Sequence, residues 1–127
     1  MSVERFPAGF AHYSDAVTVS GPGRWIHVSG QVGFDEDMKV VSGGVKAEAH
    51  ATIDAIERVL EKAGADLSHV IRITVFMTDL ADYGEFAEAR AERWPENPPA
   101  SAAVQVAGLL VGAQIEIDAV AFVPEDV

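Results

Sequence analysis

A carboxylate within an apolar strand pattern is the first feature of this sequence that points to chemistry. Glu116 lies in the run QIEIDAVA at residues 114–121, where isoleucine and alanine occupy alternate positions. A carboxylate in such a setting can act as a general acid or base. It can equally be a satisfied core or interface residue without a catalytic role. The residues alone leave both interpretations open.

Other patterns that carry chemistry are missing from the sequence. The chain has no cysteine, which excludes disulfides, thiolate metal sites and cysteine nucleophiles. No serine lies in a G-x-S-x-G context, so a nucleophile elbow is not indicated. The histidines follow neither H-x-x-x-H nor H-E-x-x-H spacing, and we expect no metal site; they are His12, His27, His50 and His69.

The glycines form no nucleotide-binding pattern, because neither G-x-G-x-x-G nor G-x-x-x-x-G-K-[ST] occurs. Ser29-Gly30 ends a predicted strand, and this position suggests a role in ligand binding. A glycine there lets a ligand approach the backbone closely. The plain alternative is a turn.

Glycine and proline divide the chain into short elements. Apolar residues at spacings of three and four predict a helix over residues 45–63, ended by Gly64. Asp82 followed by Glu85 predicts a capped second helix that runs to about Trp94. Alternating or β-branched patterns predict strands over residues 16–20, 24–29, 70–77, 101–106 and 114–122. The turn at residues 21–23 predicts that the first two strands form a hairpin.

The order β-β-α-β-α-β-β predicts an α+β fold, a mixed β-sheet with two helices packed on one face. The second face of that sheet would carry apolar side chains together with Glu116 and Asp118. Such a mixed surface is best explained by burial between subunits. We therefore expect an oligomer.

The length and the net charge of the chain limit the classes of protein to which it can belong. The 127 residues are 49% hydrophobic and 23% charged, which predicts one domain over residues 1–127 with a substantial core. A net charge of −11 opposes binding to nucleic acid. No apolar run is long enough for a signal peptide or a membrane span. We expect a soluble cytoplasmic protein that binds neither nucleic acid nor membrane.

Four segments together resemble the Rid family, also called the YjgF family, whose members are often labelled endoribonuclease L-PSP. They are WIHVSGQV at residues 25–32, the helix that ends in KAGA at residues 62–65, ITVFMTDL at residues 73–80, and PAS at residues 99–101 with QIEIDAVA at residues 114–121. The resemblance implies a chorismate-mutase-like fold and a homotrimer with small-molecule clefts between subunits. In the founding subgroup these clefts hydrolyse reactive imines and enamines derived from amino acids. No metal or organic cofactor is implied.

The resemblance also implies roles for individual residues. Glu116 matches the glutamate that positions the attacking water, and Tyr13 matches a tyrosine that lines the cleft. Ser29 and Gly30 match the Ser-Gly whose backbone borders the ligand.

This chain departs from the family at the carboxylate-binding motif. The motif P-A-R-S-C reads P-A-S-A-A at residues 99–103, so Ser101 stands at the position of the arginine that binds the substrate carboxylate. Ala103 stands at the cysteine position, and Ala87 matches the family's cleft asparagine. A serine hydroxyl offers neither the charge nor the second parallel bond of a guanidinium. Arg90 is a candidate replacement if it faces the cleft, and the alternative is a solvated helix residue.

The leading hypothesis is a trimeric hydrolase of an imine, an enamine or a related labile metabolite other than a simple 2-imino acid. The alternative is a trimer that binds or senses a small ligand without catalysis. Ribonuclease activity is disfavoured, because the nine basic residues are scattered and outnumbered by twenty acidic ones.

Overall fold

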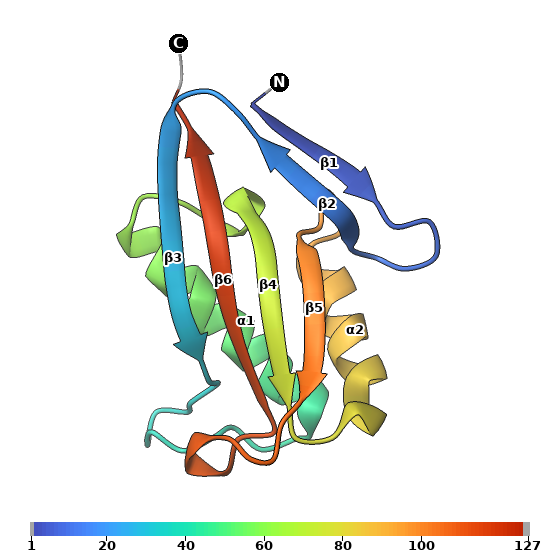
Figure 1. Cartoon of the computed structure of the whole chain (residues 1–127). Helices are drawn as coiled ribbons and strands as arrows, with labels where there is room; N and C mark the ends of the chain where they lie inside the picture. Colours follow the sequence, from blue (N-terminus) through green and yellow to red (C-terminus); the bar gives the residue numbers. More distant parts are fainter. Residues whose placement is uncertain (1, 126–127) are drawn as a thin grey trace.

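The computed structural model describes residues 2–125 and shows a six-stranded mixed sheet with two helices on one face (Figure 1). The strand order is β1-β2-β5-β4-β6-β3, with β5 parallel to both of its neighbours and the other pairs antiparallel. The α+β fold with both helices on one face is confirmed. The strands are β1 (Val3–Pro7), β2 (Ser14–Val19), β3 (Gly23–Gln31), β4 (Val70–Met77), β5 (Ala100–Gln105) and β6 (Ile115–Pro124). The helices are α1 (Val45–Lys62) and α2 (Tyr83–Arg93), with short 3-10 turns η1 (Leu67–His69), η2 (Leu80–Asp82) and η3 (Leu110–Gly112).

The hairpin predicted for the first two strands is wrong. β2 pairs with β1 and β5, whereas β3 lies at the opposite edge of the sheet and pairs only with β6. The Gly-Pro-Gly link therefore carries the chain across one end of the sheet, where the Pro22 carbonyl accepts a hydrogen bond from the Glu125 N–H at 3.0 Å. A turn sequence fixes a reversal of direction, but the long pairing with β6 decides where β3 lies.

The strand β1 was not predicted from the sequence. Its five residues, VERFP, include two adjacent charged side chains and show no apolar alternation. The strand exists because β2 offers it an antiparallel partner along its whole length. Figure 1 shows β1 and β2 as a ribbon that projects away from the rest of the sheet.

Helix α1 covers the centre of the sheet, as its spacing predicted. Ala49, Ile53, Ile56 and Leu60 are fully buried on its inner face. They join Ile73, Val75, Ile115 and Ile117 from β4 and β6 in one core cluster. We call the side of the sheet that carries these residues the helix-covered face.

Helix α2 begins differently from the prediction. Asp82 is its N-cap residue, but no cap hydrogen bond is made by that side chain. The Glu85 carboxylate accepts instead from the Lys46 N–H at 3.2 Å, so it joins the starts of the two helices. The capping box fails because the η2 turn precedes the helix directly and is capped by Asp79.

Strand parity places the candidate side chains on defined faces. In the ladder between β4 and β6, Phe76 lies opposite Glu116, and Thr74 lies opposite Asp118. These residues alternate with the buried isoleucines, so they point to the other side of the sheet. We call this side the open face; its central residues are Thr74, Phe76, Glu116, Asp118 and Val120. In the described part of the chain, no helix is long and apolar enough to cross a membrane.

A buried carboxylate fixes the start of β6. Glu48 on α1 is 3% exposed, and its two oxygens accept from the Gln114 backbone N–H at 3.0 Å and the Gln114 side-chain amide at 2.6 Å. This pair of bonds holds the segment that leads into Glu116 against the helix. This role was not predicted from the sequence, although Glu48 lies on the same helix face as the buried Val45 and Thr52.

We predict that Glu48→Ala lowers the free energy of unfolding by about 2–4 kcal/mol, because two donors of Gln114 then lose their buried acceptor. Urea denaturation at fixed protein concentration measures this loss. Glu61→Ala, on the exposed end of the same helix, is the control and should change stability by less than about 0.5 kcal/mol. Equal effects of the two substitutions would contradict the assigned role.

Candidate functional site

Two groups of candidate residues come together in the structure, and the first surrounds Glu116. The pairing of β3 with β6 shifts between Val28 and Gln31, so Ser29 and Gly30 together lie opposite Asp118 as a β-bulge. A Cβ atom on residue 30 would collide with Oε2 of Glu116. Glycine is therefore required at this position for the Glu116 carboxylate to lie against the strand. The bulge brings the Glu116 side chain against Gly30, and the close approach of a ligand to this backbone stays a prediction.

The Glu116 carboxylate is partly buried on the open face. Phe76 flanks it from β4, and Val104 on β5 continues the same row. Asp118, two residues along β6, is also partly buried and lies beside Thr74. Glu116 is thus an acid beside an apolar ring, with exposed backbone of the bulge next to it.

The second group surrounds Arg90. Its Nη1 donates to the Tyr83 hydroxyl and to the Ser101 hydroxyl, both at 3.1 Å. The Arg90 Cζ lies 5.1 Å from the ring centroids of Tyr13 and Phe86 and 5.7 Å from that of Tyr83. The residue is only 2% exposed. Arg90 is therefore not a solvated helix residue; its guanidinium is directed at Ser101.

The loop that carries Tyr13, the segment at Pro98–Pro99 and strand β5 hold this second group in place. Ser14 follows Tyr13, and both its backbone N–H and its hydroxyl donate to the Pro98–Pro99 segment that leads into β5. This anchors Tyr13 beside Ser101 and above Arg90. Ala87, three residues before Arg90 on α2, is partly buried, and Ala103 packs against the core.

The two groups point to opposite sides of the sheet. Ser101 lies opposite Ile73, and Ala103 lies opposite Val75, which places both on the helix-covered face. Glu116 lies on the open face. The structure therefore joins Gly30 with Glu116, and Tyr13 with Arg90 and Ser101, but within one chain it does not join the two groups with each other.

Tyr83 and Phe86 belong to the second group and were not predicted. They lie seven and four residues before Arg90, so all three occupy one face of α2. This spacing was visible in the sequence. What was not visible is that the same face packs over β5 and the Tyr13 loop.

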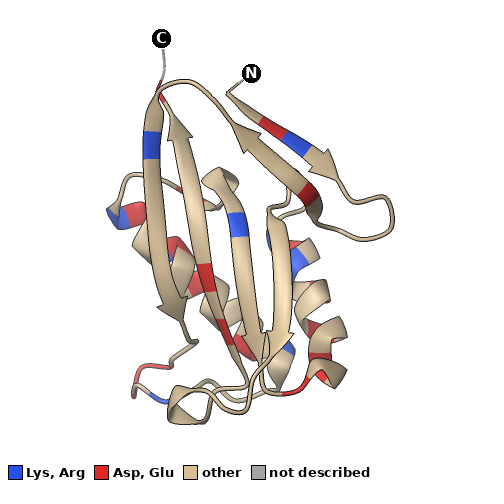
Figure 2. Cartoon of the chain, viewed as in Figure 1, with Lys and Arg blue, Asp and Glu red and all other residues tan. Residues whose placement is uncertain are grey.

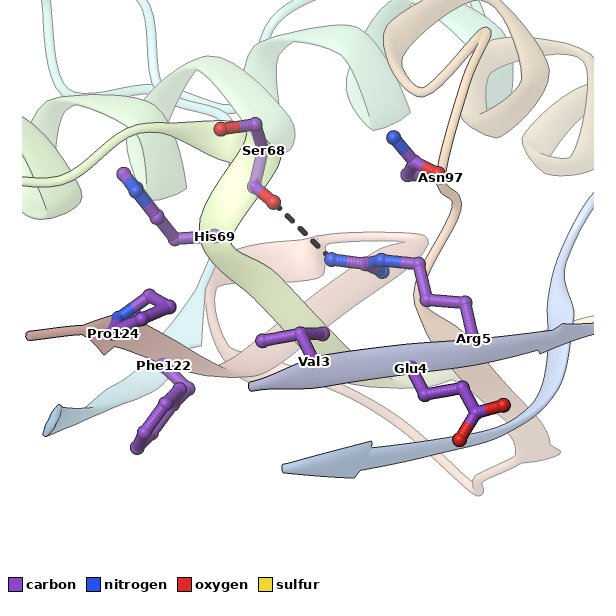
Figure 3. Close-up of a pocket in the computed structure, with 8 residues that line it drawn as sticks. All are labelled: Val3, Glu4, Arg5, Ser68, His69, Asn97, Phe122 and Pro124. Atoms are coloured by element: carbon purple, nitrogen blue, oxygen red, sulfur yellow. Dashed lines mark hydrogen bonds between the residues drawn. The ribbon is translucent and has the colours of Figure 1, made fainter. Parts of the chain in front are cut away.

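A cavity of about 780 Å³ lies elsewhere, between β1, η1 and the end of β6 (Figure 3). None of the residues expected from the sequence lines it. Arg5 reaches into it and donates to the carbonyls of Ser68, Val70 and Pro98 at 3.1–3.3 Å. Burial lowers the pKa of the Arg5 guanidinium. Arg5 serves here to tie β1 to the neighbouring segments.

The histidines have separate structural contacts. His12 Nε2 lies 2.6 Å from the Trp94 carbonyl, His50 pairs with Glu92, and His69 Nδ1 accepts from the Asp66 N–H. Among residues 2–125, no group of three or more acidic or histidine side chains is placed to hold a metal ion.

Comparison with known proteins gives a consistent result. The family model described as endoribonuclease L-PSP matches residues 3–123. A 2-iminobutanoate/2-iminopropanoate deaminase of Rattus norvegicus is 39% identical over 122 residues, covering 95% of this chain and 87% of the relative. Protein DfrA of Myxococcus xanthus is 39% identical over 119 residues, covering 93% and 90%. The crystal structure of RidA from an Antarctic Psychrobacter superimposes with a TM-score of 0.75 at 34% identity, covering 97% of this chain and 99% of that one.

We predict that Gly30→Ala displaces the Glu116 side chain, because the new methyl group would occupy the space of its carboxylate. The overpacking should cost about 1–3 kcal/mol of stability. The ¹³C shift of the Glu116 carboxyl carbon and a denaturation curve measure both effects.

Gly108→Ala is the matched control, since no atom lies within 4 Å of a Cβ at that position. The account of the bulge is wrong if the Glu116 signal moves no further in Gly30→Ala than in this control.

Proposed function

The chain belongs to the Rid family, the family whose model is described as endoribonuclease L-PSP, and we propose that it is a homotrimer whose inter-subunit clefts hydrolyse a reactive imine or enamine. The observation that carries the proposal is Glu116, held beside the Gly30 bulge on a sheet face that no helix covers. The relatives named as 2-iminobutanoate/2-iminopropanoate deaminases support this reaction class.

The separation of the two residue groups supports a site between subunits. A small ligand cannot touch both faces of one sheet, because the sheet and its side chains lie between them. A second copy can bring its Tyr13–Arg90–Ser101 group to the Glu116 group of the first. A cyclic trimer repeats this heterologous contact three times. Each Glu116 group then meets one Tyr13–Arg90–Ser101 group of a neighbouring subunit.

The composition of the open face supports the same assembly. Trp25 and Val104 are 52% and 43% exposed, and Phe76 and Val120 are partly buried beside them. Apolar side chains gathered on a face without a helix are typical of a subunit interface. Burying this face also moves Glu116 into a more enclosed setting.

The chemistry follows from a carboxylate beside a water molecule. The Glu116 carboxylate accepts a proton from water as the water oxygen attacks the imine carbon, which forms the C–O bond. Nitrogen receives this proton, which gives a carbinolamine. The carboxylate then takes the carbinolamine O–H proton and passes it to nitrogen, the C–N bond breaks, and ammonia leaves as the carbonyl forms. An enamine enters the same sequence once its carbon is protonated to give the imine. The backbone at Ser29-Gly30 borders the ligand.

The three positions at which this chain departs from the family pattern favour a bulkier ligand than 2-iminopropanoate. Ala87, Ser101 and Ala103 each have a smaller side chain than the asparagine, arginine and cysteine of the family pattern. We propose an imine substrate larger than the simple 2-imino acids.

The charge distribution disfavours a ribonuclease, despite the family label. Lys and Arg are scattered over several elements, and β6 displays acidic residues on the open face (Figure 2). A polyanionic substrate needs clustered basic side chains to neutralise its phosphates.

We predict that the protein accelerates ammonia release from imines generated in situ by an amino-acid oxidase, with imines from leucine or phenylalanine hydrolysed faster than that from alanine. Glu116→Gln should lower kcat/KM by about 10²–10⁴, because the general base is lost. Asp118→Asn, the next carboxylate on the same face, is the control and should retain most activity.

Failure to accelerate any of these imines, by a preparation that is folded and trimeric, would contradict the hydrolase. Ligand-dependent thermal stabilisation without turnover would then favour the trimer that only binds a ligand.

The trimer itself is open to a direct test. Light scattering should give three times the 13.5 kDa chain mass. Val120→Lys should lower this mass, because a lysine at the centre of the open face would be buried at the interface. Glu61→Lys places a lysine on the exposed side of α1 and should leave the mass unchanged. A wild-type monomer would contradict the proposed assembly.

A further inference from the structure

Arg90 is a buried cation without an anionic partner. In residues 2–125 its guanidinium forms no ion pair, and its Nε–H is buried without any acceptor. Arg93, one turn further along α2, shows the ordinary arrangement: it pairs with Asp54 at 2.8 Å and Glu57 at 3.6 Å. A buried charge is expensive unless it is paired. The unpaired Nε–H of Arg90 therefore marks a place where a partner is missing.

The groups around Arg90 are also arranged for an anion. The Tyr83 and Ser101 hydroxyls each accept a hydrogen bond from Nη1, which leaves the O–H hydrogen of each free to donate. The remaining neighbours are the rings of Tyr13 and Phe86, which are not strong acceptors. The cluster thus presents N–H and O–H donors around one guanidinium.

The Arg90 cluster lies at Ser101, the residue at which this chain departs from the family motif. The Nη1 atom lies 3.1 Å from the Ser101 hydroxyl, on the residue where the family's arginine is attached. The positive charge has therefore moved from strand β5 to helix α2, and the shorter side chain at position 101 leaves room for it.

We propose that Arg90 binds the carboxylate of the ligand through its unpartnered Nε–H and the adjacent Nη2, in place of the arginine missing from position 101. The inference rests on the proposed function and narrows its substrate class to imines and enamines that carry a carboxylate. The Nε–H and Nη2 edge receives the anion side-on, as guanidinium forks do. The Nε–H is buried in the single chain, and the partly buried Tyr13 ring must move aside for the anion to reach it.

The test measures binding, because binding needs Arg90 and not turnover. The probe is 4-methyl-2-oxopentanoate, the oxo acid that hydrolysis of the leucine imine releases, and its neutral primary amide is the ligand control. Calorimetry should show that the acid binds and that the amide binds at least about 30-fold more weakly. In the wild-type protein, the ¹⁵N–¹H signal of Arg90 Nε should shift as the acid is added.

Four variants locate the anion site. Arg90→Gln should weaken binding of the acid at least about 30-fold, since the charged pair is lost. Arg58→Gln removes the same charge from an exposed position on α1 and should bind normally. The double variant Arg90→Gln/Ser101→Arg returns the arginine to the strand and should recover binding. Arg90→Lys keeps the charge without the planar fork and should bind at least tenfold more weakly than wild type.

Several results would overturn the proposal. They are equal binding of acid and amide, no binding of either by the wild type, an unchanged Arg90 Nε signal at saturation, or wild-type affinity in Arg90→Gln. The Nε signal needs no substitution, so the proposal remains testable if a variant fails to fold. The oxo acid is a product of hydrolysis, so its binding requires no proton transfer by Glu116. Binding without hydrolysis would therefore contradict the proposed function alone, and hydrolysis of neutral imines only would contradict this inference alone.

Discussion

The alternation of side chains across one sheet is the constraint on which the rest of this structure depends. Because the period of a strand is two, Glu116 and Ser101 are fixed to opposite faces once β6, β4 and β5 pair in their observed register. The helix-covered face is filled by the core and holds Arg90 and Ser101, whereas the open face carries Glu116. In the proposed trimer, one ligand would use both groups across an interface between subunits.

The separation of the two faces also determines where the charged groups of the candidate site lie. Glu116 lies beside the bulge, and Arg90 lies among rings and hydroxyls, so the carboxylate and the guanidinium of the candidate site lie on opposite faces of the sheet. In the proposed trimer they would meet in one cleft without pairing directly. A ligand with an electrophilic carbon and an anionic group would occupy the space between them.

Local patterns predicted the helices and most strands, because each depends on residues close in sequence. The apolar spacing of α1 and the alternation of β6 are confirmed to within a few residues. The position of β3 beside β6 and the existence of β1 were missed, since both depend on partners distant in the chain. The site was predicted as a set of residues through the family resemblance. Which of them share a face, and that Arg90 is buried beside Ser101, required the packing of α2 on β5.

The central claim is that one cleft takes Glu116 from one subunit and Arg90 from another, and mixed trimers test it most directly. Glu116→Gln and Arg90→Gln chains, each with little activity alone, are co-expressed in equal amounts and the hybrid trimers are purified. The account predicts recovery toward about a third of wild-type activity, because one of the three clefts in each mixed cyclic trimer combines an intact Glu116 with an intact Arg90. If each site lay within one chain, every site would keep one defect. Activity no higher than that of the single variants, in trimers shown to be mixed, would contradict the account.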